Sequence, residues 1–318
     1  MQKKNAGDIY PRLTERNEMM EDPIKNLQGF RKEHDFLVGI DSDGCAFDSM
    51  EIKHKECFIP NTINEWGLQA ISKYAREAAE FVNLYSRWRG INRFPALINV
   101  FELLEDREEV KKREFKLPEY EAIKTWMNSE SKLGNPTLEK EVARTGDPVL
   151  SRALKWSVAV NKTIEEMVHD VPPFPFVRKS LDKMFYTADI LVVSATPFEA
   201  LEREWKEHGI AEHVKVIAGQ EMGSKAEILK IAKKGRYDQE HVLMIGDAIG
   251  DMNAAKSNGV LFYPINPGNE DESWERFHSE AFERFTSGNY KGAYEEKVIA
   301  EFEKYLPSTP PWKIKKEK

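Results

Sequence analysis

The sequence predicts an α/β protein: a Rossmann-like, doubly wound parallel sheet core with a large inserted α-helical cap domain. Two observations support this class. Short apolar runs of strand length recur at the start of the chain and again after residue 180, where helical stretches separate them. The long region between the first two runs has helical periodicity and no comparable strand signal. A length of 318 residues accommodates both parts.

The predicted strands are short, rich in β-branched residues and followed by small or turn-forming residues. Runs of this kind are typical of strands that are buried on both faces of a parallel sheet. In chain order the predicted strands are Phe36–Ile40, Ile190–Val193, Val214–Ile217, Val242–Ile245 and Val260–Tyr263. The third of these is the weakest, and the other four are clear.

Helical stretches separate the later strands, as expected for βαβ units. We predict helices over Phe198–His208 and Lys225–Lys234, and two surface helices over Ser273–Phe285 and Tyr294–Tyr305. The basic tail Lys313–Lys318 is expected to be a solvated end of the chain.

The region between the first two strands is predicted to be the inserted domain. From Ile71 onward, apolar residues such as Tyr74, Ala78 and Phe81 recur at steps of three and four residues. The proline-rich segment Val171–Pro175 closes the region as a stiff linker. We therefore expect a split core, residues 1–48 and 176–318, and a helical cap domain, residues 49–175.

Composition excludes several classes of protein. Hydrophobic residues make up 41% of the chain, as in a globular protein, and the net charge of −7 argues against a nucleic acid as partner. No apolar run approaches the ~20 residues that a membrane-spanning helix needs. The two cysteines, Cys45 and Cys57, form neither a disulfide framework nor a Cys-x-x-Cys pair, which favours a cytoplasmic location. We expect a monomer or a homodimer.

Chemically reactive side chains follow the predicted strands at the point where each strand ends. In an open parallel sheet, ligands bind at the carboxyl ends of the strands, so these side chains should converge on one edge. Lys225, at the start of a helix, should reach the same edge. The strand-end residues are the first-strand pair Asp41 and Asp43, the second-strand Ser194, and the fourth-strand pair Asp247 and Asp251.

This set of side chains predicts phosphoryl chemistry at a metal centre. Clustered carboxylates repel one another, which favours a hard divalent cation such as Mg²⁺ with oxygen ligands. Lys225 and Ser194 add a positive charge and a hydrogen-bond donor for a phosphoryl group. A carboxylate such as that of Asp41 can attack phosphorus and form an aspartyl-phosphate, which divides one difficult displacement into two easier ones.

At this point the chain resembles the haloacid dehalogenase superfamily, whose four motifs it matches in order. The segment that begins at Asp41 is similar to the first motif, with Cys45 where threonine is usual. Ser194 in Val-Val-Ser-Ala-Thr-Pro is similar to the second and Lys225 in Gly-Ser-Lys-Ala to the third. Gly246-Asp-Ala-Ile-Gly-Asp is similar to the fourth. The inserted region lies between the first and second motifs, where the family places its helical cap.

The resemblance implies a role for each motif residue. Asp41 would be the nucleophile, and Asp43 the acid and base that protonates the leaving alcohol and then activates water. Ser194 and Lys225 would hold the phosphoryl oxygens. Mg²⁺ would be bound by Asp41, the backbone carbonyl of Asp43 and Asp247, with Asp251 as a ligand or a partner of a ligand. An aspartate at position 43 favours phosphate esters over the superfamily's dehalogenase and phosphonatase reactions.

These roles predict Mg²⁺-dependent hydrolysis of a small phosphorylated metabolite, such as a sugar phosphate. Two alternatives stay open: a phosphomutase of the same superfamily, and a binding or regulatory relative without activity. In the predicted cap, Arg87, Arg89 and Arg93 lie among aromatic residues. They are either a substrate-recognition patch or solvated arginines at the end of an amphipathic helix.

Simpler explanations exist for each motif taken alone. Asp-Gly pairs such as Asp43-Gly44 are common turn formers, and Asp247 with Asp251 could cap a helix. Lys225 could be an ordinary surface lysine. The order of all four motifs along the chain favours the functional interpretation. Cys45 is expected to be a packing residue, because no sequence neighbour is placed to activate its thiol.

Overall fold

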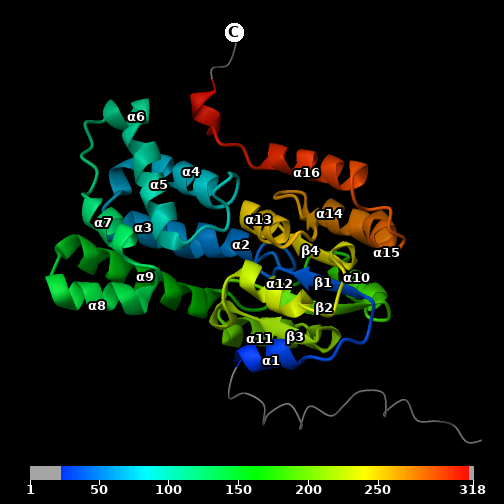
Figure 1. The fold of residues 1–318 in the computed structure, drawn as a ribbon. Coiled ribbons are helices and arrows are strands. Elements are labelled where there is room, and N and C mark those ends of the chain that lie inside the picture. The colour runs from blue at the N-terminus through cyan, green and yellow to red at the C-terminus, as the bar shows by residue number, and fades with distance from the viewer. Residues whose placement is uncertain (1–22, 315–318) are drawn as a thin grey trace, which may run out of the picture.

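A computed structural model describes residues 23–314 of the chain (Figure 1). Within this range five strands form one sheet in the order β3-β2-β1-β4-β5, and every neighbouring pair is parallel. The predicted α/β class is therefore confirmed. The strands are β1 (Phe36–Ile40), β2 (Ala188–Val193), β3 (Val216–Ala218), β4 (Val242–Gly246) and β5 (Leu261–Pro264).

The α-helices occupy three parts of the described chain. One precedes the sheet, α1 (Pro23–Gly29). Those between β1 and β2 are α2 (Ser49–Ile52), α3 (Ile59–Glu65), α4 (Ser72–Asn83), α5 (Arg93–Glu105), α6 (Glu108–Lys111), α7 (Glu121–Ser129), α8 (Asn135–Thr145), α9 (Pro148–Met167) and α10 (Val177–Met184). Those that follow are α11 (Phe198–Glu207), α12 (Lys225–Lys233), α13 (Ile249–Asn258), α14 (Glu270–Arg276), α15 (Phe282–Thr286) and α16 (Ala293–Tyr305).

The two faces of the sheet are buried by different helices, as alternation along each strand requires. In β1, Val38 and Ile40 lie in one core cluster with residues of α10, α11, α14 and α15. Leu37, on the opposite face, lies in a second cluster with residues of α1, α12 and α13. Burial on both faces explains why the strands appear in the sequence as continuous apolar runs rather than alternating ones.

The insertion between β1 and β2 is helical and has an apolar core of its own. The buried members of that core all lie between Ile59 and Val160. In Figure 1 these helices form a separate group beside the sheet, with α8 and α9 at its lower edge. Among the described residues of the insertion no strand occurs, as the sequence predicts.

Two predicted elements show how the structure differs in detail from the sequence prediction. The weak strand expected at Val214–Ile217 begins at Val216, although the backbone N–H of Lys215 already donates to the carbonyl of Ile190 at 2.8 Å. The helix expected over Ser273–Phe285 begins earlier, and a π-helical turn over Phe277–Ala281 separates α14 from α15. That turn buries Phe277 and Ala281 against the sheet.

The chain packs against the insertion just before the predicted basic tail, and the two tail residues that the structure describes, Lys313 and Ile314, are exposed as expected. The Lys313 ammonium lies 2.8 Å from a carboxylate oxygen of Asp106, and Trp312 packs against the apolar core of the inserted helices. Residues 315–318 of the predicted basic tail lie outside the described part of the chain. Across residues 23–314, no helix is long and apolar enough to cross a bilayer.

Candidate active site

Strand register brings the predicted site residues to one edge of the sheet. Ile40 pairs with Val192 on one side and with Ile245 on the other. The residues that follow these strands therefore emerge at the same level. The backbone N–H of Asp41 donates to the carbonyl of Ile245 at 3.0 Å, and that of Ser194 to the carbonyl of Ala218 at 3.0 Å. Chain order and parallel pairing together bring Asp41, Ser194 and Asp247 close to one another.

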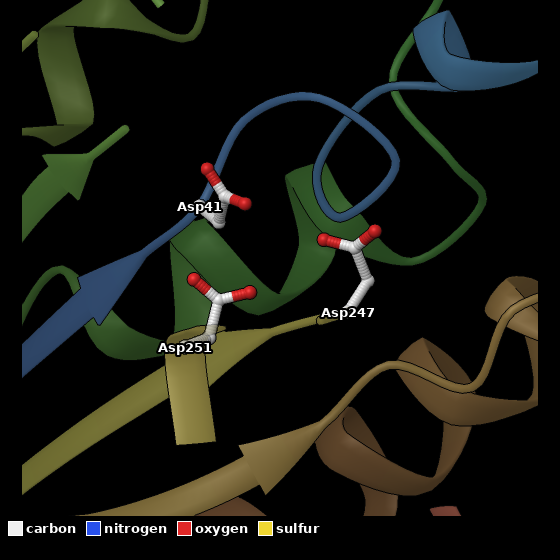
Figure 2. A group of neighbouring side chains, drawn as sticks. All are labelled: Asp41, Asp247 and Asp251. Carbon is white, nitrogen blue, oxygen red and sulfur yellow. The ribbon is translucent and has the colours of Figure 1, made fainter. Parts of the chain in front are cut away.

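Three buried carboxylates meet at this edge. Asp41 follows β1, Asp247 follows β4, and Asp251 lies in the first turn of α13; Figure 2 shows their carboxylates turned toward one another. One oxygen from each lies within 4.8 Å of the others. Asp251 is held in place because its Oδ2 accepts the backbone N–H of Ala248 at 3.0 Å, which fixes the start of the helix.

Lys225 joins two of these carboxylates. Its ammonium lies 2.6 Å from Asp41 Oδ2 and 2.6 Å from Asp251 Oδ1. It enters from the first residue of α12, where Ser224 and Glu227 form a capping box that fixes the start of the helix. Burial lowers the pKa of Lys225, but the charges of Asp251 and Asp41 outweigh this effect and raise it, so the side chain is a cation.

The carboxylate cluster carries more negative charge than its protein partners neutralise. Burial and the neighbouring charge of Asp251 raise the pKa of Asp41 to about 6, despite the opposing effect of Lys225. Burial and Asp41 likewise raise the pKa of Asp247 to about 6, although Arg89 lowers it. Raised values of this kind mean that a further cation would stabilise the ionised cluster.

Asp247 has one oxygen occupied and one free. Its Oδ2 accepts a hydrogen bond from Arg89 Nε at 2.5 Å, whereas its buried Oδ1 has no partner within the described structure. This unpartnered oxygen lies beside two other carboxylates. Carboxylate oxygens grouped in this way are the ligands that a hard divalent cation such as Mg²⁺ prefers. The residues present therefore fit a Mg²⁺ ion, for which Asp41 and Asp247 would supply oxygens and Asp251 would be a ligand or a partner of a ligand.

Gly44 makes room for the contact between Arg89 and Asp247. Its φ of +71° is one that side-chain-bearing residues rarely adopt. A Cβ on this residue would also collide with Arg89 Nη2 and lie only 2.7 Å from Asp247 Oδ2. Position 44 thus needs glycine both for the turn after β1 and for the space around Asp247.

Asp43 lies apart from the three-carboxylate cluster and has partners of its own. One oxygen accepts from Ser49 Oγ at 2.5 Å and from the Lys53 ammonium, and the other accepts from Thr196 Oγ1 at 2.8 Å. Burial raises the pKa of Asp43, but the charge of Lys53 and these hydrogen bonds lower it by more, so the pKa falls to about 2. The carboxyl is therefore ionised in this arrangement.

A cavity of about 790 Å³ opens over this edge of the sheet, between the sheet and the inserted helices. The predicted site residues Asp41, Asp43, Ser194, Lys225 and Asp247 all line it. Buried Asp251 lies behind them as a partner of Lys225. Ser194 is buried, and its Oγ accepts the backbone N–H of Thr196 at 3.2 Å.

The three arginines predicted in the insertion have three different environments. Arg89 is buried and reaches Asp247, the Leu84 carbonyl and the Gly44 carbonyl. Arg93 lines the cavity and bonds to Ser157 and Asn161. Arg87 is exposed and is not among the residues that line the cavity. Only Arg93 and Arg89 are therefore near the site.

Several polar residues at the site were not singled out from the sequence. Lys53 and Ser49 lie on the first turns of the insertion, and Thr196 follows Ser194 by two residues. Glu204 on α11 also lines the cavity; burial and the charge of Asp43 raise its pKa to about 7. Thr196 could have been suspected from its place beside a strand end, but nothing local to Lys53 or Glu204 marks them as site residues.

A comparison with known protein families finds a match for this chain. The family model described as haloacid dehalogenase-like hydrolase matches residues 103–264. No curated protein sequence gives a significant match.

The solved structures that the chain matches have low sequence identity to it. A haloacid dehalogenase-like family hydrolase from Streptococcus pneumoniae is 15% identical, with a TM-score of 0.42 over 84% of this chain and 98% of its own. YfnB from Bacillus subtilis, solved with bound magnesium, is 11% identical, with a TM-score of 0.45 over 74% and 88%. CbbY from Rhodobacter sphaeroides, solved with phosphate, is 13% identical, with a TM-score of 0.39 over 72% and 85%.

Proposed function

This chain belongs to the family of haloacid dehalogenase-like hydrolases, and we propose that it hydrolyses a small phosphomonoester with the help of Mg²⁺, through an aspartyl-phosphate intermediate. One observation carries the proposal. The buried Asp41 carboxylate faces the shared cavity, with a lysine ammonium at 2.6 Å and two further carboxylates beside it. A nucleophilic carboxylate, a cation and an acidic cluster at one cavity are the parts that phosphoryl transfer requires.

Asp41 is the proposed nucleophile. Its Oδ1 accepts the backbone N–H of Ser42 at 2.8 Å and its Oδ2 accepts Lys225, so the carboxylate is held in one orientation. In the first step one oxygen of Asp41 forms a bond to phosphorus, and the bond from phosphorus to the alcohol oxygen of the ester breaks. Ser194 and Lys225 are the proposed donors to the phosphoryl oxygens, because both line the cavity beside Asp41.

Asp43 is the proposed acid and base. The departing alcohol oxygen needs a proton, which Asp43 would deliver in its protonated form. In the second step the Asp43 carboxylate takes a proton from water, whose oxygen attacks phosphorus and releases phosphate and the Asp41 carboxylate. The contacts of Asp43 with Lys53, Ser49 and Thr196 favour its ionised form, which suits the second step. The first step therefore requires a change in at least the contact with Lys53.

The acidic cluster is the proposed site of Mg²⁺, held by Asp41, Asp247, the backbone carbonyl of Asp43 and, directly or through a ligand, Asp251. The free Oδ1 of Asp247 supports this assignment. When bound, the ion would neutralise the carboxylates and polarise the phosphoryl oxygens.

Residues 49–175 are the proposed cap domain on a split core of residues 1–48 and 176–318. Their separate apolar core and their place over the cavity support this division. Such a cap would exclude water and select the leaving group, while the core performs the chemistry. A small phosphorylated metabolite is the proposed partner. Both cysteines are free and buried, which supports a reducing, cytoplasmic compartment.

Hydrolysis of p-nitrophenyl phosphate, with Mg²⁺ and with EDTA, tests the proposed function. We expect Mg²⁺-dependent release of nitrophenol by the wild type and a loss of about 10³-fold or more for Asp41→Asn. The exposed Asp271→Asn on α14 is the matched control and should keep full activity. Circular dichroism checks that both variants are folded. Activity retained by folded Asp41→Asn would exclude Asp41 as the nucleophile, and activity retained in EDTA would exclude the metal.

A further inference from the structure

Arg93 lies at the cavity, and one nitrogen of its guanidinium, Nη1, carries the hydrogen bonds that hold it. It is the first residue of α5, and the guanidinium carbon lies 5.1 Å from the centre of the Phe58 ring. Within residues 23–314, the guanidinium donates its hydrogen bonds through Nη1: 2.6 Å to Asn161 Oδ1, 2.9 Å to Ser157 Oγ and 3.2 Å to the Ser157 carbonyl. All three acceptors come from α9, so the packing of α5 on α9 fixes the orientation of the guanidinium.

The charge of Arg93 has no counter-ion in the described part of the chain. Among the described residues, no carboxylate forms an ion pair with it, whereas Arg89, four residues earlier, is paired with Asp247. Glu165 and Glu199 line the same cavity, and neither forms an ion pair with Arg93. Burial, with no compensating acid, lowers the pKa of Arg93 to about 10, so it remains a cation at neutral pH.

An unpaired cation in a partly desolvated position is unfavourable unless an anion joins it. Nη2 and Nε form no hydrogen bond among residues 23–314 and are not sealed inside the core, so they are available to a ligand in the cavity. Two donors in one plane match the geometry of a carboxylate or a phosphate. The amide group of Asn161 is fixed beside them by its contact with Nη1.

We propose that Arg93 binds a second oxyanion, a carboxylate or a phosphate, carried by the leaving group of the substrate. This inference rests on the proposed function, because Asp41 and Lys225, which line the same cavity, would hold the phosphoryl group that is transferred. The preferred substrate class is then a phosphomonoester with two anionic groups. Arg93 acts on specificity: it contacts the part of the substrate that does not react.

Two pairs of substrates distinguish the two kinds of oxyanion. 3-Phosphoglycerate and glycerol 3-phosphate differ in a carboxylate, and fructose 1,6-bisphosphate and fructose 6-phosphate differ in a second phosphate. We expect the wild type to prefer the doubly anionic member of at least one pair by about 10- to 100-fold in kcat/KM, the range for a charge-assisted hydrogen-bond pair. The pair that shows the preference identifies the oxyanion.

Three variants assign that preference to Arg93. Arg93→Gln should reduce the preference to about onefold, while its kcat/KM for the singly anionic member stays near that of the wild type. Arg93→Lys should keep part of the preference, because it retains the charge but loses the planar pair of donors. Arg152→Gln, an exposed arginine on α9 in the same insertion, is the matched control and should behave like the wild type. Thermal unfolding checks that Arg93→Gln is folded.

Binding measurements separate this inference from the proposed function. Isothermal titration calorimetry of the wild type, Arg93→Gln and Arg152→Gln with all four compounds requires no turnover. If no compound is hydrolysed but the wild type binds one doubly anionic member more tightly and Arg93→Gln does not, the proposed function fails and the anion site stands. A wild type that shows no preference in either pair, in turnover or in binding, overturns the inference. Equal losses on both members of a pair in folded Arg93→Gln also overturn it.

Discussion

Arg89, in the turn between α4 and α5, joins the insertion to the acidic cluster. It is buried, and its Nε lies 2.5 Å from Asp247 Oδ2. A buried ion pair contributes little net stability, but the loss of one partner leaves an uncompensated charge in the interior. Because Asp247 also belongs to the proposed metal site, the consequence of that loss depends on whether a cation is available.

We predict that Arg89→Met is destabilised without metal and recovers with it. In EDTA the free energy of unfolding should fall by about 3–5 kcal/mol, the usual cost of breaking a buried pair from one side. Mg²⁺ should then raise the melting temperature of the variant more than that of the wild type. The ion replaces the positive charge that the variant lacks, and in the variant it is not repelled by the guanidinium of Arg89. Thermal unfolding with EDTA and with MgCl₂ measures both effects.

The exposed Arg144, which pairs with Glu141 in α8, is the control for this experiment. Arg144→Met should change the free energy of unfolding by less than about 1 kcal/mol, with or without Mg²⁺. An equal rise in melting temperature on adding Mg²⁺ to the wild type and to Arg89→Met would contradict the shared use of Asp247.

At the scale of elements, Asp189 fixes the entry of the chain into the central strand. It lies at the start of β2, with its side chain buried. One oxygen accepts the backbone N–H groups of Glu33 and His34, at 2.9 and 3.1 Å, and the hydroxyl of Tyr237 at 2.6 Å. Residues 33 and 34 lead directly into β1, so Asp189 joins the start of β1 to its neighbour β2.

The pKa of Asp189 predicts how this contact depends on pH. Burial raises the pKa, but the hydrogen bonds from Tyr237, Glu33 and His34 lower it overall. A carboxyl whose pKa is lowered by folding stabilises the fold above its ordinary pKa. That contribution disappears as the pH falls through the folded-state pKa. Asp189→Asn should therefore lose about 2–4 kcal/mol at pH 7, with a smaller difference from the wild type at pH 3.

Urea unfolding at pH 7, 4 and 3 measures this difference. Asp182→Asn is the matched control, because Asp182 is exposed and its ion-pair partner is the imidazole of His213 at 2.8 Å. Its effect should stay below about 1 kcal/mol at every pH. A constant difference between the wild type and Asp189→Asn from pH 7 to pH 3 would show that the charge of Asp189 is not what stabilises the junction.

At the scale of the whole molecule, the C-terminal segment is a third connection between the sheet and the inserted helices. It leaves α16 and crosses to the insertion, as the red segment of Figure 1 shows. The centre of the Trp312 ring lies 5.8 Å from that of Phe81, and the Arg107 guanidinium lies 4.5 Å from the centre of the Trp312 ring. The backbone N–H of Arg87 donates to the Pro307 carbonyl at 3.3 Å. The insertion is joined to the sheet by the two chain segments that follow β1 and precede β2. The packing of the C-terminal segment adds a third, non-covalent link.

We predict that Trp312→Ala loosens the inserted helices and leaves the sheet unchanged. The free energy of unfolding should fall by about 1–2 kcal/mol, as expected when one half-buried aromatic contact is lost. Hydrogen–deuterium exchange should become faster in α4, which contains Phe81, and stay unchanged in β1 and β4. Mass spectrometry of peptides from these elements measures the exchange.

Lys313→Gln serves as the control, because it removes only the exposed ion pair with Asp106 and should have almost no effect. Faster exchange in β1 as well as in α4 would mean that Trp312 stabilises the molecule as a unit rather than the position of the inserted helices.

Local sequence patterns were sufficient to predict the sheet and the residues at its edge. The strands are continuous apolar runs because both faces of the sheet are covered, and a turn-forming or polar residue follows each run. Asp41, Ser194 and Asp247 could be predicted at the site because parallel strands present their carboxyl ends at one edge. The helical character of the insertion was equally visible, since its periodicity is local.

Tertiary structure alone decided which residues contact one another across the molecule. The partner of Arg89 is 158 positions away along the chain, and that of Lys313 is 207 positions away. No periodicity or turn signal records such pairs, because they depend on how the inserted helices pack over the sheet. For the same reason the sequence showed three similar arginines, whereas the fold exposes Arg87, pairs Arg89 with a carboxylate and leaves Arg93 without one. Local patterns thus determined the strands and the acidic edge, and long-range packing decided which charges near that edge are neutralised.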